Sequence, residues 1–407
     1  MGILTGKKII LGVGGSIAAY KAVDLASKLT QAGAQVDVIL TSAATRFVTP
    51  LSFASVTGRN AYTDADLWGG QSHVLHVGLG HGADLLLLAP CTANTIAKLA
   101  NGMADNLLTI TALAARCPIL LAPAMDAGMY ENPATARNVE VLRSHGMLFA
   151  GPAVGRMASG LTGLGRFLEP AEIVGYARAA LGANGPLAGK KVIITAGGSR
   201  QAIDPVRYIS NRSSGKQGYA VAQAAIDAGA TVTLISHPTG LPVPATATLL
   251  QVETAEQMAQ AVQAQLQTGA NALIMAAAVA DFTPALPKDQ KIKKRDGVLS
   301  LDLAPTQDIL AQVAAERATL PALKAVIGFA AETQDLVTNA REKLTRKKLD
   351  MVAANDISAS DAGFGVDDNR VSMIFADGRV LNLPLIGKDE VAENIIAQLV
   401  AILKNAS

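Results

Sequence analysis

Residues 7–15 read KKIILGVGG, and residues 190–198 repeat this pattern as KKVIITAGG. In both copies a short apolar run ends at a Gly-Gly-Ser turn, a helical stretch follows, and a second strand comes after Ala-Gly-Ala. Strand, helix and strand in this order form a βαβ opening. The chain starts the same architecture twice, which predicts two doubly wound, Rossmann-like α/β domains.

The linker between the two domains is predicted from composition. Residues 181–187, LGANGPL, are rich in Gly, Pro and Asn and show no periodicity. A chain of 407 residues is long enough for two or three domains that each bury a core. We therefore expect one domain at residues 1–185 and a second at residues 186–407.

Strands and helices are expected to alternate in both domains. In the first domain the expected strands lie near residues 8–13, 35–41, 84–89 and 119–122, and the expected helices near 17–31, 92–101 and 129–144. In the second domain the expected strands lie near residues 192–195, 231–236, 272–277, 325–329 and 351–354. Residues 371–383 alternate apolar and polar around Asp377-Gly378, which predicts a β-hairpin. An amphipathic helix is expected from Asp389.

Composition narrows the class of protein. Hydrophobic residues make up 50% of the chain, but the apolar runs are shorter than the roughly 18 residues that a membrane span needs, so we expect a soluble protein. Residues 1–8 carry charges but no apolar h-region, so we expect no export or anchor signal. Two cysteines, Cys91 and Cys117, suggest free thiols in a reducing cytoplasm. A formal net charge of +2 disfavours nucleic-acid binding.

The turn after the first strand suggests a phosphate site. Gly14-Gly15-Ser16 precedes a helix, so backbone N–H groups and the positive helix end suit an anion, although a structural turn with Ser16 as N-cap is equally compatible. The spacing departs from G-x-G-x-x-G, so a mononucleotide fits better than a dinucleotide. Ser42 and residues 89–94 follow other strands and should converge on the same crevice. Spacing alone does not choose among His73, His76 and His81.

Three motifs in the first domain resemble the flavin-dependent cysteine decarboxylases. They read GGSIAAYK at 14–21, APCTANTIAKLANGMADNL at 89–107 and APAMD at 122–126. The resemblance implies a flavodoxin-like domain that binds FMN and acts on a C-terminal or amide-linked cysteine. It assigns the essential histidine, eight residues before Asp84, to His76. The residues that it implies for the FMN site are Gly15, Ser16, Ile17, Ser42, Thr92 and Asn94.

The implied chemistry is oxidation of the substrate's cysteine side chain by FMN, loss of CO₂ and return of the hydride. Two catalytic positions differ from the family's usual residues. Asp126 stands where an Asn commonly binds the substrate carboxylate, so either burial keeps Asp126 protonated or another group holds that carboxylate. Ser159 stands where a flap Cys commonly donates a proton. A hydroxyl is the weaker acid, so Ser159 relays a proton from water or the last reduction stalls.

The second domain carries an insertion in its βαβ opening. Gly15 to Gly33 spans 18 residues, whereas Gly198 to Gly229 spans 31, and the 13 additional residues correspond to the polar stretch 204–216. This stretch could hold a phosphate or an acyl intermediate, or it could be a surface loop. Residues 276–281, AAAVAD, allow close approach of a ligand, and the basic run at 291–295 could close over a triphosphate or be a solvated face.

These segments resemble phosphopantothenate–cysteine ligase. The motifs are DPVRYISNRSSG at 204–215, AAAVAD at 276–281, KIKK at 291–294, GFAAET at 328–333 and AND at 354–356. The resemblance implies that Asn211 stabilises an acyl-cytidylate and that Lys291 contacts this intermediate and the nucleotide. Gln201 and Gln307 differ from the usual Glu and Pro. The other residues implied for the nucleotide site are Ala276, Ala277, Ala278, Asp281, Gln307, Asp308, Ile309, Leu310, Phe329, Lys343 and Lys347.

The two resemblances together match the bacterial bifunctional coenzyme A biosynthesis family, in which the ligase makes the decarboxylase's substrate. The implied reactions are ligation of cysteine to 4′-phosphopantothenate with CTP and Mg²⁺, then FMN-dependent decarboxylation of phosphopantothenoylcysteine to 4′-phosphopantetheine. No metal ligands are identified. The resemblance also implies a homo-oligomer, built from trimers of the flavin domain and dimers of the ligase domain.

Two alternatives stay open at this point. In the first, the ligase is active, while the flavin domain binds FMN and assembles the oligomer but decarboxylates poorly because of Asp126 and Ser159. In the second, which rests on fold alone, the protein is a nicotinamide-dependent dehydrogenase. The absence of G-x-G-x-x-G with a ribose-binding acid at the expected distance argues against the second alternative.

Overall fold

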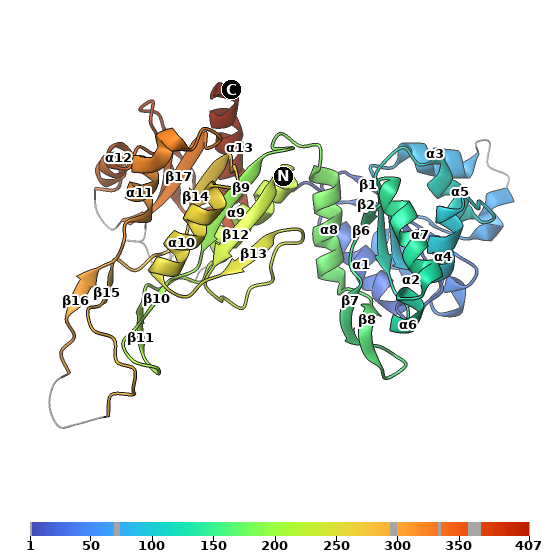
Figure 1. Ribbon diagram of the computed structural model, residues 1–407. Helices are drawn as coiled ribbons and strands as arrows, with labels where there is room; N and C mark the ends of the chain where they lie inside the picture. Colours follow the sequence, from blue (N-terminus) through green and yellow to red (C-terminus); the bar gives the residue numbers. More distant parts are fainter. Residues whose placement is uncertain (1, 69–73, 294–298, 333–334, 357–367, 407) are drawn as a thin grey trace. The chain divides into compact units, whose positions relative to one another are not determined.

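The computed structural model describes residues 2–68, 74–293, 299–332, 335–356 and 368–406 (Figure 1). The chain divides into two compact units, Met1–Gly182 and Ala183–Ser407. No helix in these described ranges is both long enough and apolar enough to cross a membrane.

The first unit alternates strands and helices over its whole length. Its elements are β1 (Lys8–Val13), α1 (Ala19–Gln31), β2 (Gln35–Leu40), η1 (Ala44–Arg46), α2 (Pro50–Thr57), β3 (Ala61–Tyr62), η2 (Asp64–Trp68), α3 (Leu75–Gly82), β4 (Leu85–Cys91), α4 (Ala93–Ala100), α5 (Leu107–Ala114), β5 (Ile119–Pro123), α6 (Ala127–Tyr130), α7 (Pro133–Ser144), β6 (Leu148–Phe149), β7 (Ala153–Arg156), β8 (Thr162–Arg166) and α8 (Pro170–Gly182).

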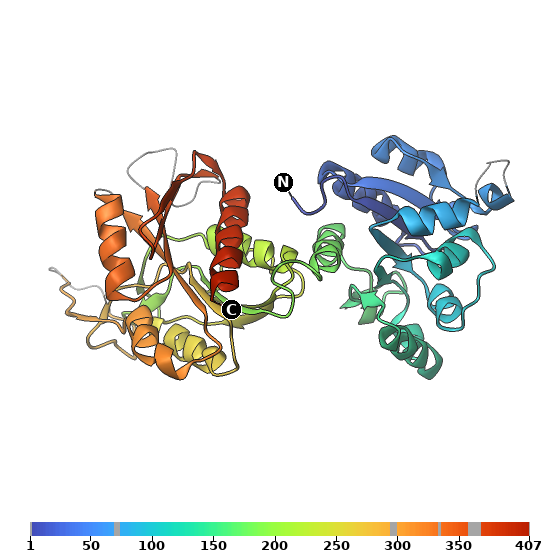
Figure 2. The same ribbon diagram turned by 90° about the horizontal axis from the view of Figure 1, so that it is seen from above.

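A parallel sheet with the strand order β3-β2-β1-β4-β5-β6 forms the centre of this unit. If the two-residue strand β3 is left out, the strand order is that of flavodoxin-like folds. If β3 is counted, the strand order is that of the Rossmann fold. Side chains alternate between the faces of β1, so Ile9 packs in a core with α1, α2 and α8. Ile10 packs on the other face, where α4, α5 and α7 contribute to a second core. Helices cover both faces of this sheet (Figure 2). The strands are buried on both faces, as the apolar sequence runs predict.

The second unit repeats this plan and adds hairpins. Its elements are β9 (Lys191–Ala196), β10 (Arg200–Ala202), β11 (Tyr208–Ser210), α9 (Lys216–Asp227), β12 (Thr231–Ser236), β13 (Thr248–Gln251), α10 (Ala255–Leu266), β14 (Ala272–Met275), β15 (Phe282–Pro284), β16 (Leu303–Pro305), α11 (Ile309–Glu316), η3 (Arg317–Thr319), β17 (Ala325–Glu332), α12 (Leu336–Arg346), β18 (Met351–Asp356), β19 (Asp368–Asn369), β20 (Val371–Phe375), β21 (Val380–Asn382), β22 (Ile386–Gly387) and α13 (Lys388–Asn405).

The second sheet has the order β13-β12-β9-β14-β17-β18-β20-β21. The first six of these strands are parallel, and β20 and β21 continue the sheet antiparallel to their neighbours. One core contains Met258 of α10, Ile309 of α11 and Ala340 of α12. Helices α9 and α13 pack together, away from that core. In both sheets the strand order reverses beside the first strand, which is where doubly wound folds bind ligands.

The structure confirms the α/β class and the hairpin at residues 371–383, where β20 pairs with β21 and Gly378 has a φ of 89°. The single helix expected at 129–144 is wrong. It is divided into α6 and α7 because Pro133 cannot continue a helix and the Asn132 side chain instead caps the next one. Helix α1 begins at Ala19, so Ser16 is not its N-cap, and β17 continues to Glu332, past the expected end.

Candidate functional site

Loops after neighbouring strands meet closely at the carboxyl edge of the first sheet. The backbone N–H of Gly14, after β1, donates to the Pro90 carbonyl oxygen of β4 at 3.0 Å. A Cβ on Gly14 would lie 2.7 Å from that oxygen, and a Cβ on Gly15 would lie 2.9 Å from the carbonyl carbon of Ala43, in the loop after β2. Only glycine permits this approach. The two glycines therefore bring the strand ends together in a cradle of backbone groups.

Polar side chains predicted for the first site surround this turn. Ser16 Oγ accepts a hydrogen bond from the N–H of Ala18 at 3.2 Å. This contact stabilises the turn, which is the structural alternative to ligand binding for this side chain. Thr92 Oγ1 caps α4 by accepting from Thr95. The predicted residues Ile17, Ser42 and Asn94 are exposed.

The two positions at which the chain differs from the decarboxylase motifs contact one another. Asp126 caps α6 through Oδ1, which accepts the Gly128 N–H at 3.1 Å. Ser159 lies between β7 and β8, and its Oγ donates to Asp126 Oδ2 at 2.8 Å. The hairpin rests directly on this loop, because the Met125 N–H donates to the Gly165 carbonyl oxygen at 3.1 Å.

The histidines stand apart from these contacts. His76 is half-buried on α3, a helix that packs against α5. It makes no hydrogen bond or ion pair with any described residue of this chain. His81 is exposed, and His73 lies outside the described residues.

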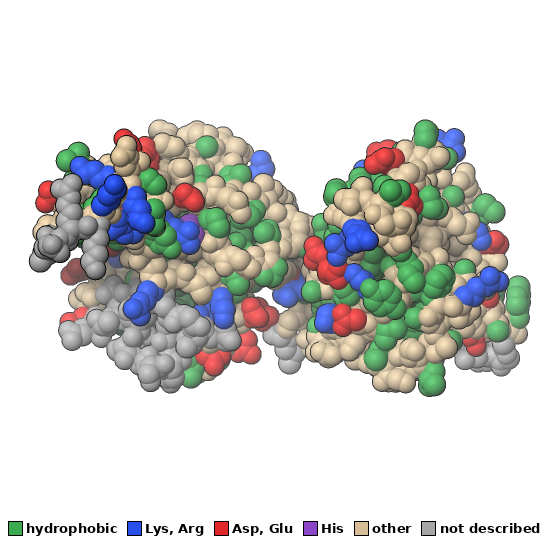
Figure 3. All heavy atoms as spheres, turned by 90° about the horizontal axis from the view of Figure 1, so that it is seen from below, with side chains coloured by type: hydrophobic (Ala, Val, Ile, Leu, Met, Phe, Trp, Pro, Cys, Tyr) green, Lys and Arg blue, Asp and Glu red, His purple; other side chains and the backbone are tan. Residues whose placement is uncertain are grey.

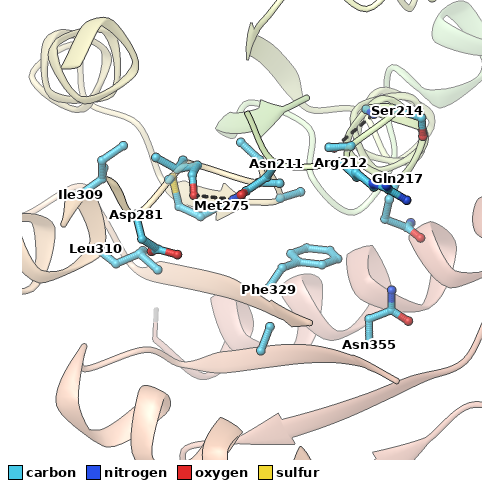
Figure 4. Close-up of a pocket in the computed structure, with 18 of the residues that line it drawn as sticks. Asn211, Arg212, Ser214, Gln217, Met275, Asp281, Ile309, Leu310, Phe329 and Asn355 are labelled. Atoms are coloured by element: carbon cyan, nitrogen blue, oxygen red, sulfur yellow. Dashed lines mark hydrogen bonds between the residues drawn. The ribbon is translucent and has the colours of Figure 1, made fainter. Parts of the chain in front are cut away.

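A pocket of about 650 Å³ opens at the carboxyl edge of the second sheet (Figure 4). Its walls come from the loop before α9, the segment after β14, the start of α11, and strands β17 and β18. The structure brings together here all of the nucleotide-site residues expected from the sequence except Lys291, namely Asn211, Ala276, Ala277, Ala278, Asp281, Gln307, Asp308, Ile309, Leu310, Phe329, Lys343 and Lys347.

Hydrogen bonds hold the lining side chains in place. Asn211 Nδ2 donates to the Val279 carbonyl oxygen at 3.0 Å, and Lys343 Nζ donates to the Phe329 carbonyl oxygen at 2.6 Å. Gly198, after β9, forms a bridge with Ala278, after β14, so the loops of neighbouring strands meet as they do in the first unit. Figure 4 shows Asp281, Ile309 and Leu310 on one side of the Phe329 ring in that view, and Gln217 and Asn355 on the other.

An ion pair joins two further lining residues. Lys347 Nζ lies 3.0 Å from Asp308 Oδ2, while Asp308 Oδ1 accepts the Ala311 N–H at the start of α11. Burial alone would raise the pKa of the Asp308 carboxyl, but the hydrogen bonds from Lys347 and Ala311 outweigh it and hold that pKa below its ordinary value. Asp308 therefore carries a negative charge that neutralises part of the positive charge of the pocket lining.

The pocket is electropositive overall. Its lining carries more cationic than anionic side chains, and the first turn of α9, the positive end of that helix, lines the same pocket. This combination suits a polyanion such as a nucleoside triphosphate. The cationic lining residues are Arg212, Lys216, Lys343, Lys347 and Lys388, and the anionic ones are Asp281 and Asp308.

Sequence reasoning missed several lining residues. Arg212 and Asn355 lie inside motifs that were recognised but were not singled out. Asn369 is only 3% exposed and Lys388 only 8%, although both are polar. A buried polar side chain indicates a binding or catalytic site, but no local pattern in the sequence shows that the side chain is buried.

Lys291 does not line the pocket and is exposed. The segment that carries it is nevertheless anchored, because the neighbouring Ile292 N–H donates to Asp204 Oδ2 at 3.0 Å. Burial would raise the pKa of the Asp204 carboxyl, but the N–H groups of Ile292, Val206 and Arg207 outweigh it and lower that pKa to about 2. Lys294 and Arg295, from the same basic run, lie outside the described residues.

Comparison with known proteins places both units in families. Residues 3–182 match the family model "Flavoprotein", and residues 187–403 match "DNA/pantothenate metabolism flavoprotein C-terminal domain". The chain is 45% identical over 405 residues to the coenzyme A biosynthesis bifunctional protein CoaBC of Bacillus subtilis, covering 99% of this chain and 98% of that protein. It is 44% identical over 413 residues to the protein of the same name from Mycobacterium tuberculosis H37Rv, covering 98% of each.

Among solved structures, the C-terminal domain of a coenzyme A biosynthesis bifunctional protein CoaBC is 39% identical, with a TM-score of 0.44. The match covers 53% of this chain and 97% of that one. The identity to the full-length relatives extends over both units and the linker. The chain belongs to the family of coenzyme A biosynthesis bifunctional proteins, CoaBC.

Proposed function

We propose that this protein ligates cysteine to 4′-phosphopantothenate at the expense of CTP and then decarboxylates the product to 4′-phosphopantetheine. The observation that carries the proposal is the basic pocket of the second unit, which gathers the ligase residues from separate motifs in a chain that matches CoaBC over its full length. We assign the decarboxylase to residues 1–185 and the ligase to residues 186–407.

In the ligase, Lys343 and Lys347 hold the triphosphate, and Asp281 and Phe329 hold the nucleoside. We also assign residues 276–278 and 307–310 to the nucleotide site. Asn211 is fixed by Val279 beside this site and contacts the activated acyl group. Lys291 approaches from its anchored segment. These groups stabilise the charge that develops as the carboxylate displaces pyrophosphate.

The protein offers Mg²⁺ few ligands of its own. The described residues contain no group of three or more His, Cys, Asp or Glu side chains that could hold a metal ion. Mg²⁺ commonly binds through substrate phosphates and one or two carboxylates. We therefore assign Mg²⁺ to the phosphates of CTP.

The first unit fits FMN. A Cβ at Gly14 or Gly15 would collide with the end of β4 or the loop after β2, so the turn keeps the close backbone approach that is typical of a phosphate site. We assign the phosphate and the flavin to the turn at residues 15–17 together with Ser42, Thr92 and Asn94. FMN supplies reversible two-electron oxidation when bound. His76 has no partner among the described residues of this chain, which supports a site completed by a neighbouring subunit.

Asp126 and Ser159 then act as a pair. Ser159 closes the β7–β8 hairpin over the substrate by donating to Asp126, and its hydroxyl is positioned to pass a proton inward. A second candidate function for this unit is FMN binding and assembly with poor decarboxylation. The observation that favours it is that Asp126, which stands where the family commonly has an amide, contacts Ser159, because a carboxylate at this position would repel the carboxylate of the substrate.

Self-association and location complete the proposal. Figure 3 shows hydrophobic side chains gathered on the visible face of the first unit, and large exposed patches commonly mark interfaces. We propose a homo-oligomer with trimers through the first unit and dimers through the second, located in the cytoplasm. The large exposed apolar side chains of the first unit include Ile17, Tyr20, Phe47, Leu51 and Trp68.

The test is mass spectrometry of the products after purified protein is incubated with 4′-phosphopantothenate, cysteine, CTP and Mg²⁺. Formation of 4′-phosphopantetheine supports both activities. Accumulation of phosphopantothenoylcysteine supports the second candidate function for the first unit. No conversion at all refutes the proposal.

A further inference from the structure

Three side-chain oxygens in the ligase pocket are buried without a hydrogen-bond donor among the described residues. They are Gln217 Oε1, Asn355 Oδ1 and Asn369 Oδ1, and all three residues line the pocket. The other unpartnered polar atoms of the described chain belong to residues outside this pocket. Buried polar atoms are nearly always paired, so their concentration in one wall indicates a ligand that brings donors.

The fold places the three residues next to one another. Gln217 lies in the first turn of α9, and its Nε2 donates to the Lys388 carbonyl oxygen at 3.1 Å, which fixes which end of the amide is the oxygen. Asn369 lies on β19, which pairs with β22 directly before Lys388. Asn355 pairs with Val371, two residues beyond Asn369. Figure 4 shows the Gln217 side chain directed toward Asn355.

The chemistry of this cluster favours an amine over a metal ion. Amide oxygens only accept hydrogen bonds, so the occupant must donate. The cluster contains no carboxylate, and Lys388, which is 8% exposed, lines the same pocket, which disfavours a divalent cation. A neutral primary amine offers two N–H donors and keeps a lone pair. A cationic neighbour lowers the pKa of an amine and so favours this nucleophilic form.

We propose that Gln217, Asn355 and Asn369 form the subsite that receives the amino group of cysteine in the ligase reaction. This inference rests on the ligase function proposed above. Two of the three amide oxygens accept the two N–H bonds and leave the lone pair for the activated carbonyl carbon. A C–N bond forms, the bond from that carbon to the cytidylate oxygen breaks, CMP leaves with the electron pair, and one proton passes to water.

The test separates the two half-reactions of the full-length protein. Pyrophosphate release from CTP with Mg²⁺ and 4′-phosphopantothenate, without cysteine, follows activation. The rate of amide formation against cysteine concentration follows the second step. Asn369→Leu and Gln217→Met each remove an oxygen and keep a similar number of side-chain heavy atoms. Gln263→Met is the matched control, because it removes an amide whose buried Nε2 has no partner among the described residues and which lies outside the pocket.

We expect KM for cysteine to rise about tenfold in each pocket variant, as the loss of one hydrogen bond predicts. Pyrophosphate release should stay within about twofold of wild type, and Gln263→Met should change neither quantity. Asn369→Asp keeps an acceptor and adds negative charge. It should retain cysteine binding and move the pH profile of the second step upward, because a carboxylate raises the pKa of a bound amine.

Two outcomes overturn the proposal. One is an unchanged KM for cysteine in the pocket variants. The other is a loss of pyrophosphate release as large as the loss of overall rate, which would assign the oxygens to CTP or 4′-phosphopantothenate. The variants lie on different elements, so misfolding of one leaves the other as a test. If the wild-type protein releases no pyrophosphate, the ligase function itself is wrong, before any variant is compared.

Discussion

Replacing Gly15 by Ala tests the phosphate cradle of the first unit. The added Cβ would lie 2.9 Å from the Ala43 carbonyl carbon, whereas ordinary contacts begin at 3.4 Å, so the loops after β1 and β2 must separate by at least 0.5 Å. Such overpacking costs about 1–3 kcal/mol. The strain displaces the backbone groups that we assign to the phosphate. We expect the Kd for FMN to rise about tenfold to a hundredfold.

The assay is a fluorescence titration of the apoprotein with FMN, accompanied by a thermal melt that reports folding. Gly82→Ala is the matched control, because its Cβ would meet no atom within 4 Å. Asn94→Ala, which leaves the loop backbone unchanged, is the second variant and should weaken binding less. A folded Gly15→Ala protein with wild-type affinity for FMN would refute the assignment of this turn to the cofactor.

Three further predictions address individual side chains. Lys291→Gln should abolish ligation, measured as phosphopantothenoylcysteine formed, and normal ligation would remove Lys291 from the site. Asp126→Asn should preserve or increase decarboxylation, measured as CO₂ released, because the repulsion of the substrate carboxylate is lost; a large decrease would show that the acid is needed. Asp204 has a pKa lowered to about 2, so its carboxylate stabilises the fold above its ordinary pKa and loses this effect as the pH falls through about 2. Urea unfolding at several pH values should therefore show Asp204→Asn destabilised at neutral pH, with the difference from wild type shrinking between about pH 4 and pH 2; a constant difference would contradict the assignment.

Much of the fold is predictable because its signals are local. The Gly-Gly-Ser turns after β1 and β9 and the Asp377-Gly378 turn are specified by neighbouring residues, so the βαβ openings and the last hairpin lie where the sequence predicts them. The break between α6 and α7 is local as well, because Pro133 specifies it, and the single helix expected near residues 129–144 took no account of this proline.

The candidate sites divide in the same way. Residues inside long motifs, such as Asn211 and Phe329, were found from the sequence, and the structure brings them into one pocket. Asn369 and Lys388 were not found, because a polar residue in a short strand or at a helix start carries no local sign of burial. Lys291 was found from its motif but lies outside the pocket lining.

The amino-acid sequence by itself determined the α/β class, the two-unit plan and the residue types available for chemistry, because short-range periodicity and turn chemistry encode them. The arrangement of the chain in space alone decided that Ser159 donates to Asp126, 33 positions away, and that Gln217 meets the backbone of Lys388, 171 positions away. Such contacts depend on strand order and on the packing of whole elements, and no stretch of neighbouring residues specifies either one.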